Sequence, residues 1–496
     1  MKFTENIPNQ LREITGNISV LTPEIVLIIS FVVILLADLF LKKNRITSLS
    51  ILAFAGIGIS GFFEILQAIN LQTLKEIGFQ NMLLLTPMAV FFKLVFGVSA
   101  LLTVLFSLDS RNLKSNHFGE FLSILFLILT GLNFLVISKN LLMIYLSVEF
   151  VSIGSYILAT FAFNKSGSEA GLKYFIFGAV SSAIMLYGMS LLYGLSGTLE
   201  LGDTLFSALQ KADTTIVALA IFMSAGGFLF KIGAFPFHTW VPDIYQAAPT
   251  PVTALFSVAP KAAGFAVLFK LIYPLIPKVF AYEAILPIFV IIASLTLAIG
   301  NFAALKQWNA KRLIAYSSIA HAGFILSALL TVSALGTFAI TYYIATYVIM
   351  NFAAFILVDI LSKETGSEDV RKFAGMGIKL PYIGVIFVIT LVALTGLPPT
   401  AGFYAKLFVF TSVWETYQQT GNSLLMFVLV FGILNAVISL YYYLKIPYYM
   451  YFKKSESTAV VNNSRGGKVL ATILSVLIIW IFLQPEWLTK YLNTLY

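Results

Sequence analysis

The chain has 496 residues, of which 59% are hydrophobic and 11% are charged. A soluble globular domain carries about 25% charged residues, so this composition excludes a soluble globule and indicates a polytopic membrane protein. The formal charge of +9 does not by itself point to nucleic acid, because lysine and arginine gather in alternate loops, as the positive-inside rule requires of a cytoplasmic face.

Apolar stretches occupy most of the chain. About 14 of them reach the roughly 20 residues that a helix needs to cross a bilayer core of about 30 Å. The sequence therefore predicts an all-α polytopic membrane protein, and two of its segments contain prolines that break the helix. In chain order the predicted segments are 21–41, 49–70, 82–107, 120–138, 141–163, 170–195, 213–249 (broken), 251–274, 283–304, 312–331, 335–361, 381–415 (broken), 423–446 and 468–484.

The first segment, 21–41, is expected to be a retained helix. About 20 mixed polar residues precede it and Lys42, Lys43 and Arg45 follow it, which is the reverse of the charge order in a cleavable signal peptide. Sorting the loops by side places about 17 basic residues on one side of the membrane and about 8 on the other. The positive-inside rule then predicts that both termini lie on the outer side.

Polar features recur along the chain at similar spacings. Glu149 precedes Lys231 by 82 residues, His321 precedes Lys406 by 85, and each of the two lysines lies close to a proline break. Two related five-helix units would account for this spacing, and a chance pairing is the alternative. The predicted division is a three-helix segment at 1–119, five-helix units at 120–275 and 283–446, and a cytoplasmic loop with a final helix at 447–496.

Lys231 lies near the end of the apolar run Ile216–Phe230 and is followed by Pro236 and His238. A charged side chain inside the bilayer costs about 2.5 to 3.5 kcal/mol on insertion scales, so a lysine beside an interrupted helix predicts a functional site. Non-helical backbone at membrane depth survives where it is buried in protein or lines a hydrated cavity. A neutral lysine or a histidine there can accept and pass a proton. A proline kink with a satisfied core histidine is the alternative interpretation.

Glu149 is the candidate partner of Lys231. It lies in the apolar segment 141–163 among Tyr145 and Ser147, whose hydroxyls can hydrogen-bond a carboxylate. Burial opposes the charged form of each group, whereas pairing favours it, so the charge states depend on whether the two groups touch. A pair that opens and closes would be a switch, and a static buried ion pair that fixes helix register is the alternative.

Further lysines lie inside apolar segments. Lys261 lies one helix beyond the first break and Lys406 lies in the second broken segment, and neither is near enough to a helix end to reach the interface easily. Lys173 and Lys93 are weaker candidates, because each lies in the early turns of its segment, where a long stem can reach the interface. Asp38, just before the basic cluster at 42–45, is expected to be interfacial.

Cofactor motifs are weak in this sequence. The run Gly56–Gly61 matches a dinucleotide fingerprint, yet it lies in an apolar span without a preceding strand, which favours close helix packing. A haem ligated by His238 and His321 is disfavoured in a chain with three histidines. The absence of cysteine excludes thiolate-bound iron–sulfur clusters and c-type haem, so such electron carriers must lie on other chains.

Two stretches carry a family resemblance. Residues 231–253, which read KIGAFPFHTWVPDIYQAAPTPVT, and residues 317–324, which read SSIAHAGF, resemble the signature of the antiporter-like membrane subunits of NADH–quinone oxidoreductase, respiratory complex I. The resemblance extends over about 120–450. It is closest to the subunit N branch, because the chain ends after its fourteenth span and Lys406 stands where the M branch has a glutamate.

The resemblance implies two inverted five-helix repeats with broken helices seven and twelve, and a proton-translocating role coupled to electron transfer elsewhere. No cofactor is then expected on this chain: NADH, FMN, iron–sulfur clusters and quinone would be bound by partner subunits. The expected partners are antiporter-like and small hydrophobic membrane subunits and the lipid of a bacterial inner membrane, without nucleic acid. The residues to which the resemblance assigns proton transfer are Glu149 and Lys231 as a pair, Lys261 as a relay, Lys406 on the exit side, His238 and His321 as bridges, and Lys173 on the uptake side.

Two other function classes remain open at this point. A subunit of a multisubunit cation/proton antiporter would use a similar fold without NADH oxidation. A purely structural membrane scaffold would tolerate simultaneous neutralisation of Glu149, Lys231 and Lys406. The electron donor, whether NADH, reduced ferredoxin or a deazaflavin, is bound elsewhere, so the sequence of this chain does not discriminate among the three.

Overall fold

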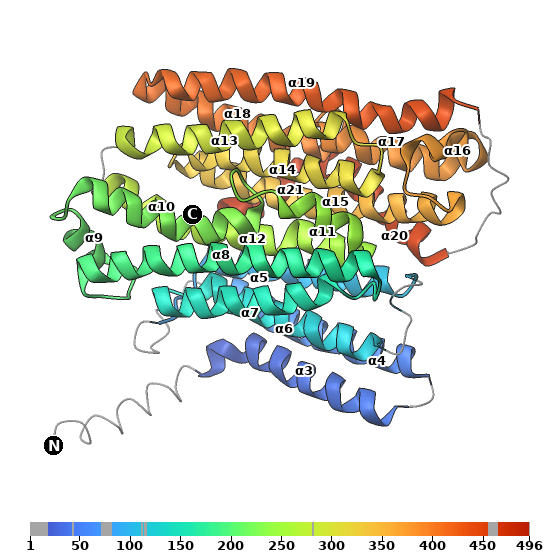
Figure 1. Cartoon of the computed structure of the whole chain (residues 1–496), viewed down its shortest axis with the longest axis horizontal. Coiled ribbons are helices and arrows are strands. Elements are labelled where there is room, and N and C mark those ends of the chain that lie inside the picture. The colour runs from blue at the N-terminus through green and yellow to red at the C-terminus, as the bar shows by residue number, and fades with distance from the viewer. Residues whose placement is uncertain are drawn as a thin grey trace.

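The chain folds into a bundle of long helices that run roughly side by side (Figure 1). Thirteen helices within the described residues are long and apolar enough to cross a membrane. The short apolar helix α17 (Pro381–Thr395), together with α18 (Ala401–Thr420), supplies a further crossing and confirms the predicted number of about 14. This computed structural model describes residues 18–41, 44–70, 82–110, 113, 117–279, 282–454 and 465–495.

Three helices form the N-terminal unit, and their bounds agree with the predicted segments to within a few residues. A short 3-10 helix, Ile18–Leu21, leads into α3. The side chain of Thr86 caps the start of α5 by accepting a hydrogen bond from the backbone of Ala89, which satisfies a donor that the helix itself leaves unpaired. The helices are α3 (Thr22–Phe40), α4 (Arg45–Ile69) and α5 (Pro87–Ser107).

The next crossings form the first five-helix unit. Its broken helix consists of α10 and α11, and the short α9 lies in the connection between α8 and α10. The bounds are α6 (Phe118–Ile137), α7 (Leu141–Ala159), α8 (Lys165–Ser196), α9 (Asp203–Leu209), α10 (Thr214–Ile232), α11 (Trp240–Ala247) and α12 (Thr250–Val279).

The second five-helix unit follows, with α17 and α18 as its broken helix, and two helices end the chain. Short turns of helix, Val370–Phe373 and α16 (Met376–Lys379), stand in the connection before α17. The remaining bounds are α13 (Tyr282–Leu305), α14 (Ala310–Leu329), α15 (Ala334–Thr365), α19 (Ser423–Phe452), α20 (Arg465–Leu483) and α21 (Pro485–Asn493).

The two units repeat each other in detail. An isolated antiparallel bridge joins Asn140 to Glu200 in the first unit and Asn309 to Asp369 in the second, so both bridge residues are shifted by the same 169 positions. Helices α8 and α15 are each 32 residues long. Because equivalent helices are separated by five crossings, an odd number, the second unit runs through the membrane in the opposite direction. The predicted inverted repeat is confirmed.

The breaks show that Lys231 and Lys406 hold different places in the two units. Gly233 ends α10 with φ +71°, and Gly396 ends α17 with φ +85°, a left-handed conformation that favours glycine. Lys231 stands before the first break, whereas Lys406 stands after the second, in α18. The repeat is therefore real, but the two lysines whose spacing suggested it lie on opposite sides of their breaks.

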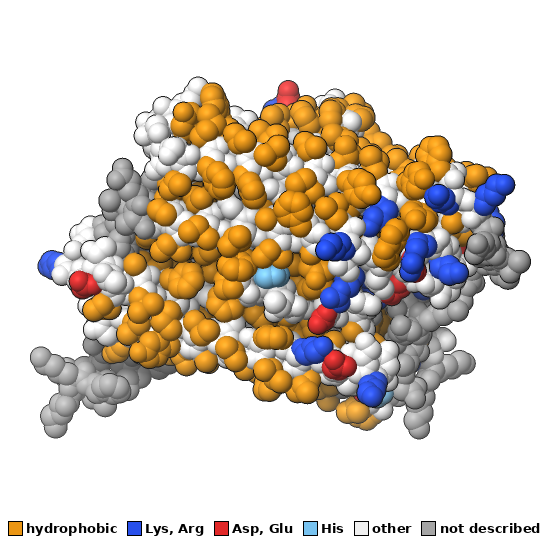
Figure 2. Space-filling model, turned by 45° about the horizontal axis from the view of Figure 1, so that its top comes forward, with side chains coloured by type: hydrophobic (Ala, Val, Ile, Leu, Met, Phe, Trp, Pro, Cys, Tyr) orange, Lys and Arg blue, Asp and Glu red, His pale blue; other side chains and the backbone are white. Residues whose placement is uncertain are grey.

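The surface matches a membrane protein. Figure 2 shows hydrophobic side chains over most of the visible face, with the lysines and arginines gathered mainly toward one end of the bundle. The sequence pattern of basic loops thus corresponds to one end of the helices, which is the distribution that the positive-inside rule describes.

Helices α8 and α10 approach each other most closely at Gly188. A Cβ atom at Gly188 would overlap the backbone nitrogen of Ser224, whereas a Cβ at Gly194, on the same helix, would meet no atom within 4 Å. Overpacking a tight contact costs about 1 to 3 kcal/mol or more. We expect Gly188→Val to lower the amount of membrane-inserted chain several-fold, measured by immunoblot of washed membranes. Gly194→Ala is the control, and equal amounts of the two variants would contradict this packing.

Candidate functional site

The first break places a lysine inside the bundle. Lys231 lies in the last turn of α10 and is 3% exposed. Its Nζ has no hydrogen-bond partner among the described residues. A cation in the last turn of a helix is favoured by the partial negative charge at that end. Lys231 is thus a buried side chain at a helix end, and its Nζ has no hydrogen-bond partner among the described residues.

Glu149 lies on α7, half-buried, and its Oε1 atom is buried without a hydrogen-bond partner in the described part of the chain. The charge of Glu149 acts on Lys231, but the carboxylate oxygens do not come within 4.0 Å of the Lys231 Nζ. The structure therefore brings the two predicted partners near each other and leaves them apart. A pair that opens and closes stays a prediction.

Lys261 lies on α12 and faces α14. The side chain is 4% exposed, and its Nζ donates to the backbone oxygen of Ser318 at 3.0 Å and to its hydroxyl at 2.9 Å. It also lies 5.8 Å from the ring centre of Tyr245. Lys261 therefore connects the first five-helix unit to the second through one serine.

His321 lies one turn along α14 from Ser318 and is 3% exposed. Its Nδ1 lies 2.6 Å from the Tyr343 hydroxyl and its Nε2 lies 3.0 Å from the Tyr443 hydroxyl. A void of about 10 Å³ is bounded by Lys261, Ser318, His321 and other residues, and this is about the size of one water molecule. Both ring nitrogens thus have hydroxyl partners, and the ring borders a water-sized space shared with Lys261.

Lys406 closes the second break. Its side chain is 5% exposed. Its Nζ donates to the backbone oxygen of Thr395, the last residue of α17, at 2.6 Å. The amine also lies 4.6 Å from the ring centre of Phe324 on α14. The charges of Lys406 and Lys261 both act on His321. Together Lys231, Lys261, His321 and Lys406 are named the central row below.

Besides Glu149, two predicted site residues lie outside this row. His238, in the first break, is half-buried, and its Nδ1 has no hydrogen-bond partner among the described residues. Lys173 is paired with Glu169 at 2.9 Å and lies 3.7 Å from Asp243, in an exposed group at one end of the bundle. The structure does not bring either residue into contact with the central row, so their proton-transfer roles stay predictions.

Sequence reasoning missed several residues. Ser318 lies inside the quoted motif at 317–324, so the sequence offered a signal by which it could have been found. Tyr343 and Tyr443 stand in apolar runs without any spacing signal, and only the packing of α15 and α19 against α14 reveals them. Lys93 was expected to reach the interface, and this is wrong: the side chain is fully buried and paired with Glu24, because α3 covers it.

Two further lysines bind helix ends. Lys270 of α12 donates to the backbone oxygen of Val136, at the end of α6, and Lys445 of α19 donates to that of Leu305, at the end of α13. Each amine satisfies carbonyl groups that a helix end leaves unpaired. These positions are equivalent in the two units, so the partly buried lysines of this chain include structural ones. Asp38 pairs with Arg45 at 2.5 Å, in agreement with its expected interfacial place.

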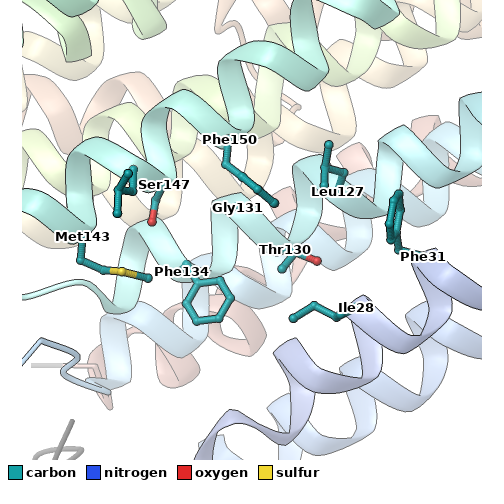
Figure 3. A pocket seen from close by; sticks show the side chains of 10 residues that line it. Ile28, Phe31, Leu127, Thr130, Gly131, Phe134, Met143, Ser147 and Phe150 are labelled. Carbon is teal, nitrogen blue, oxygen red and sulfur yellow. The ribbon is translucent and has the colours of Figure 1, made fainter.

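An open crevice of about 340 Å³ lies between α3, α6 and α7 (Figure 3). Its wall is almost entirely apolar, and only Ser147 and Thr130 offer hydroxyl groups. No ionisable side chain lines it. The described residues that line the crevice therefore offer few polar groups that could orient a nucleotide or a redox cofactor.

Residues 138–434 match the family described as the NADH:quinone oxidoreductase/Mrp antiporter transmembrane family. The chain belongs to this family. A family relative named NADH-quinone oxidoreductase subunit N 2, from Chloroherpeton thalassium, is 38% identical over 486 residues, covering 94% of this chain and 93% of the relative. Another, NADH-quinone oxidoreductase subunit N from Chlorobium chlorochromatii, is 37% identical over 94% of this chain and 91% of its own length.

Solved structures share the family fold. A chain of respiratory complex I from Thermus thermophilus, with bound aureothin, superposes with a TM-score of 0.79 at 29% identity, covering 95% of this chain and 99% of that one. A chain of the Mrp complex from Dietzia sp. superposes with a TM-score of 0.78 at 18% identity, covering 97% and 96%. The second likeness is one of fold alone.

Proposed function

We propose that this chain is a proton-translocating membrane subunit of an NADH–quinone oxidoreductase. The observation that carries the proposal is the central row, in which Lys261 and Lys406 flank His321 deep inside the bundle. Ionisable groups at membrane depth are costly to bury, so their presence there indicates a functional site. The relatives named subunit N support the complex to which the row belongs. This chain would contribute proton movement and no redox centre.

The residues of the row suit a relay. An imidazole can accept a proton at one nitrogen and release another proton from the second nitrogen, and the hydroxyls of Tyr343 and Tyr443 hold the ring of His321 with both nitrogens engaged. The water-sized void offers a path between the ring and Lys261. Glu149 would set the charge state of Lys231 as the two approach and separate.

The remaining site residues take peripheral roles in this proposal. Lys173 would tune proton uptake through its exposed group with Glu169 and Asp243, which lies at one end of the bundle. His238 would contact water at the first break, where its Nδ1 has no hydrogen-bond partner in the described part of the chain. Lys406 would release protons across the second break, because it already spans that break to Thr395.

The topology and partners follow from the same proposal. The units at 120–275 and 283–446 would act as two half-channels, flanked by segments 1–119 and 447–496. Both termini would lie on the outer side of a bacterial inner membrane. Antiporter-like and small hydrophobic membrane subunits would pack beside this chain in lipid, while other subunits would bind NADH, FMN, iron–sulfur clusters and quinone.

A native gel of mildly solubilised membranes tests the complex. We expect this chain, detected by antibody, to migrate in one large band that also stains for NADH dehydrogenase activity. A band of a smaller assembly without that activity would contradict the proposal. It would favour the second candidate, a cation/proton antiporter subunit, because the matched family description includes Mrp antiporters. Sodium-dependent growth rescue would then be expected.

A further inference from the structure

A second group of ionisable side chains is buried away from the central row, in the N-terminal unit. Glu24 of α3 and Lys93 of α5 are fully buried, and the Glu24 Oε1 atom lies 2.6 Å from the Lys93 Nζ. The same amine donates to Gln67 Oε1 at 3.2 Å, and Gln67 Nε2 donates to the backbone oxygen of Val20 at 2.7 Å. These contacts join α3, α4 and α5 around one ion pair.

A second carboxyl group lies beside this pair. Glu64 of α4 is 2% exposed. Its Oε1 accepts hydrogen bonds from Asn133 Nδ2 at 3.0 Å and from the Ser60 hydroxyl at 3.3 Å. The charges of Lys93 and Glu24 both act on Glu64. Glu64 is therefore part of the same buried cluster, and no ion pair joins it to a cation of its own within the described residues.

The charges and donors of this cluster do not balance. Lys93 offers one positive charge, and Glu24 already neutralises it, so an ionised Glu64 would leave an uncompensated negative charge inside the bundle. An unpaired charge of this kind is less favourable inside the bundle than a carboxyl group that has bound one proton near neutral pH. Two oxygen atoms, Glu24 Oε2 and Asn133 Oδ1, are also buried without any donor among the described residues. One proton bound to the cluster would neutralise the extra carboxylate and supply a missing hydrogen-bond donor.

The cluster lies level with the predicted relay. Gly131 of α6 packs directly against Val151 of α7, and Ile128 packs against Gly154, which fixes the antiparallel register of the two helices. This register places Asn133 opposite the turn of α7 that carries Glu149. Asn133 holds Glu64 from the other side of α6, so a proton on Glu64 lies one helix away from Glu149 at similar depth.

We propose that Glu24, Glu64 and Lys93 form a proton-binding site of the N-terminal unit, in which Glu64 carries one exchangeable proton. The site lies outside both five-helix units and depends on none of their residues except Asn133. Proton binding here is O–H bond formation on a Glu64 oxygen, and release returns the carboxylate, so no electron donor is needed. Ionised carboxylates in both glutamates are the competing state.

Infrared spectroscopy of the purified intact complex that contains this chain tests the site. A protonated carboxyl gives a C=O band that shifts in D₂O. We expect Glu64→Gln to remove one such band from the wild-type spectrum. Glu24→Gln should remove it too, because Glu64 then ionises beside Lys93. Lys93→Met should roughly double it, because both carboxyls are then neutral. Identical carboxyl bands in wild type and Glu64→Gln would overturn the proposal.

Two further variants keep the test decisive. Ser60→Ala removes one hydrogen bond to Glu64, so it should shift the band without removing it, which assigns the band to this carboxyl. Glu486→Gln is the matched control, since Glu486 is an exposed, paired carboxylate of α21 and should leave the band unchanged. If Glu64→Gln does not assemble, Glu64→Asp retains the carboxyl and should move the band, and an unmoved band would overturn the proposal.

Discussion

Replacing Lys231 with alanine is expected to slow NADH-driven proton translocation by about tenfold or more, because proton transfer through a positioned group contributes at least this much. Lys231 is buried at the end of α10 and has no hydrogen-bond partner among the described residues, so its removal leaves no unpaired protein group behind. The complex should therefore still assemble. The measurement is the initial rate of vesicle acidification after NADH addition, normalised to assembled complex on a native gel.

The matched control for Lys231 is Lys211→Ala. Lys211 lies in the exposed connection before α10. The substitution therefore removes the same charge from the same part of the chain and leaves the central row intact. We expect wild-type acidification from this control. Unchanged acidification by an assembled Lys231→Ala complex would contradict the role of the lysine.

Lys406→Met is expected to slow acidification to a similar extent. Methionine keeps an unbranched side chain and removes the amine that lies over Phe324 and bridges the second break to Thr395. The Thr395 oxygen loses its donor, which costs about 1 to 3 kcal/mol and adds a modest loss of stability. The measurement is again acidification per assembled complex, compared with Lys372→Ala, an exposed lysine of the same unit. Equal rates in both variants would contradict a role for the amine.

Most of the fold was predictable from the sequence, because membrane-spanning helices are recognised by the length and the apolar composition of their segments. The prediction was weakest where hydropathy does not mark the structure. Helix α18 carries so many polar side chains that it falls below the hydropathy of a spanning helix, and only its pairing with α17 completes the crossing. The equivalence of the two units rests on bridge positions such as Asn140 and Asn309, which hydropathy does not mark.

The site was predictable where charge is rare. A lysine in an apolar segment stands out, so the lysines of the central row could be named from the sequence, and the quoted motif supplied His321. The tyrosines that hold His321 could not be found, since Tyr343 and Tyr443 are ordinary members of apolar helices until packing brings their hydroxyls to the ring. Lys93 was misjudged because its partner, Glu24, lies 69 residues earlier and only the fold joins them.

The central claim is that the lysines of the row act in series as one proton path. The most direct test compares the acidification rate of the double variant Lys231→Ala/Lys406→Met with those of the two single variants, at equal amounts of assembled complex. Groups that act as one unit are strongly non-additive. The account predicts that the double variant is no slower than the slower single variant. A rate as low as the product of the two fractional losses would show independent paths and contradict the account.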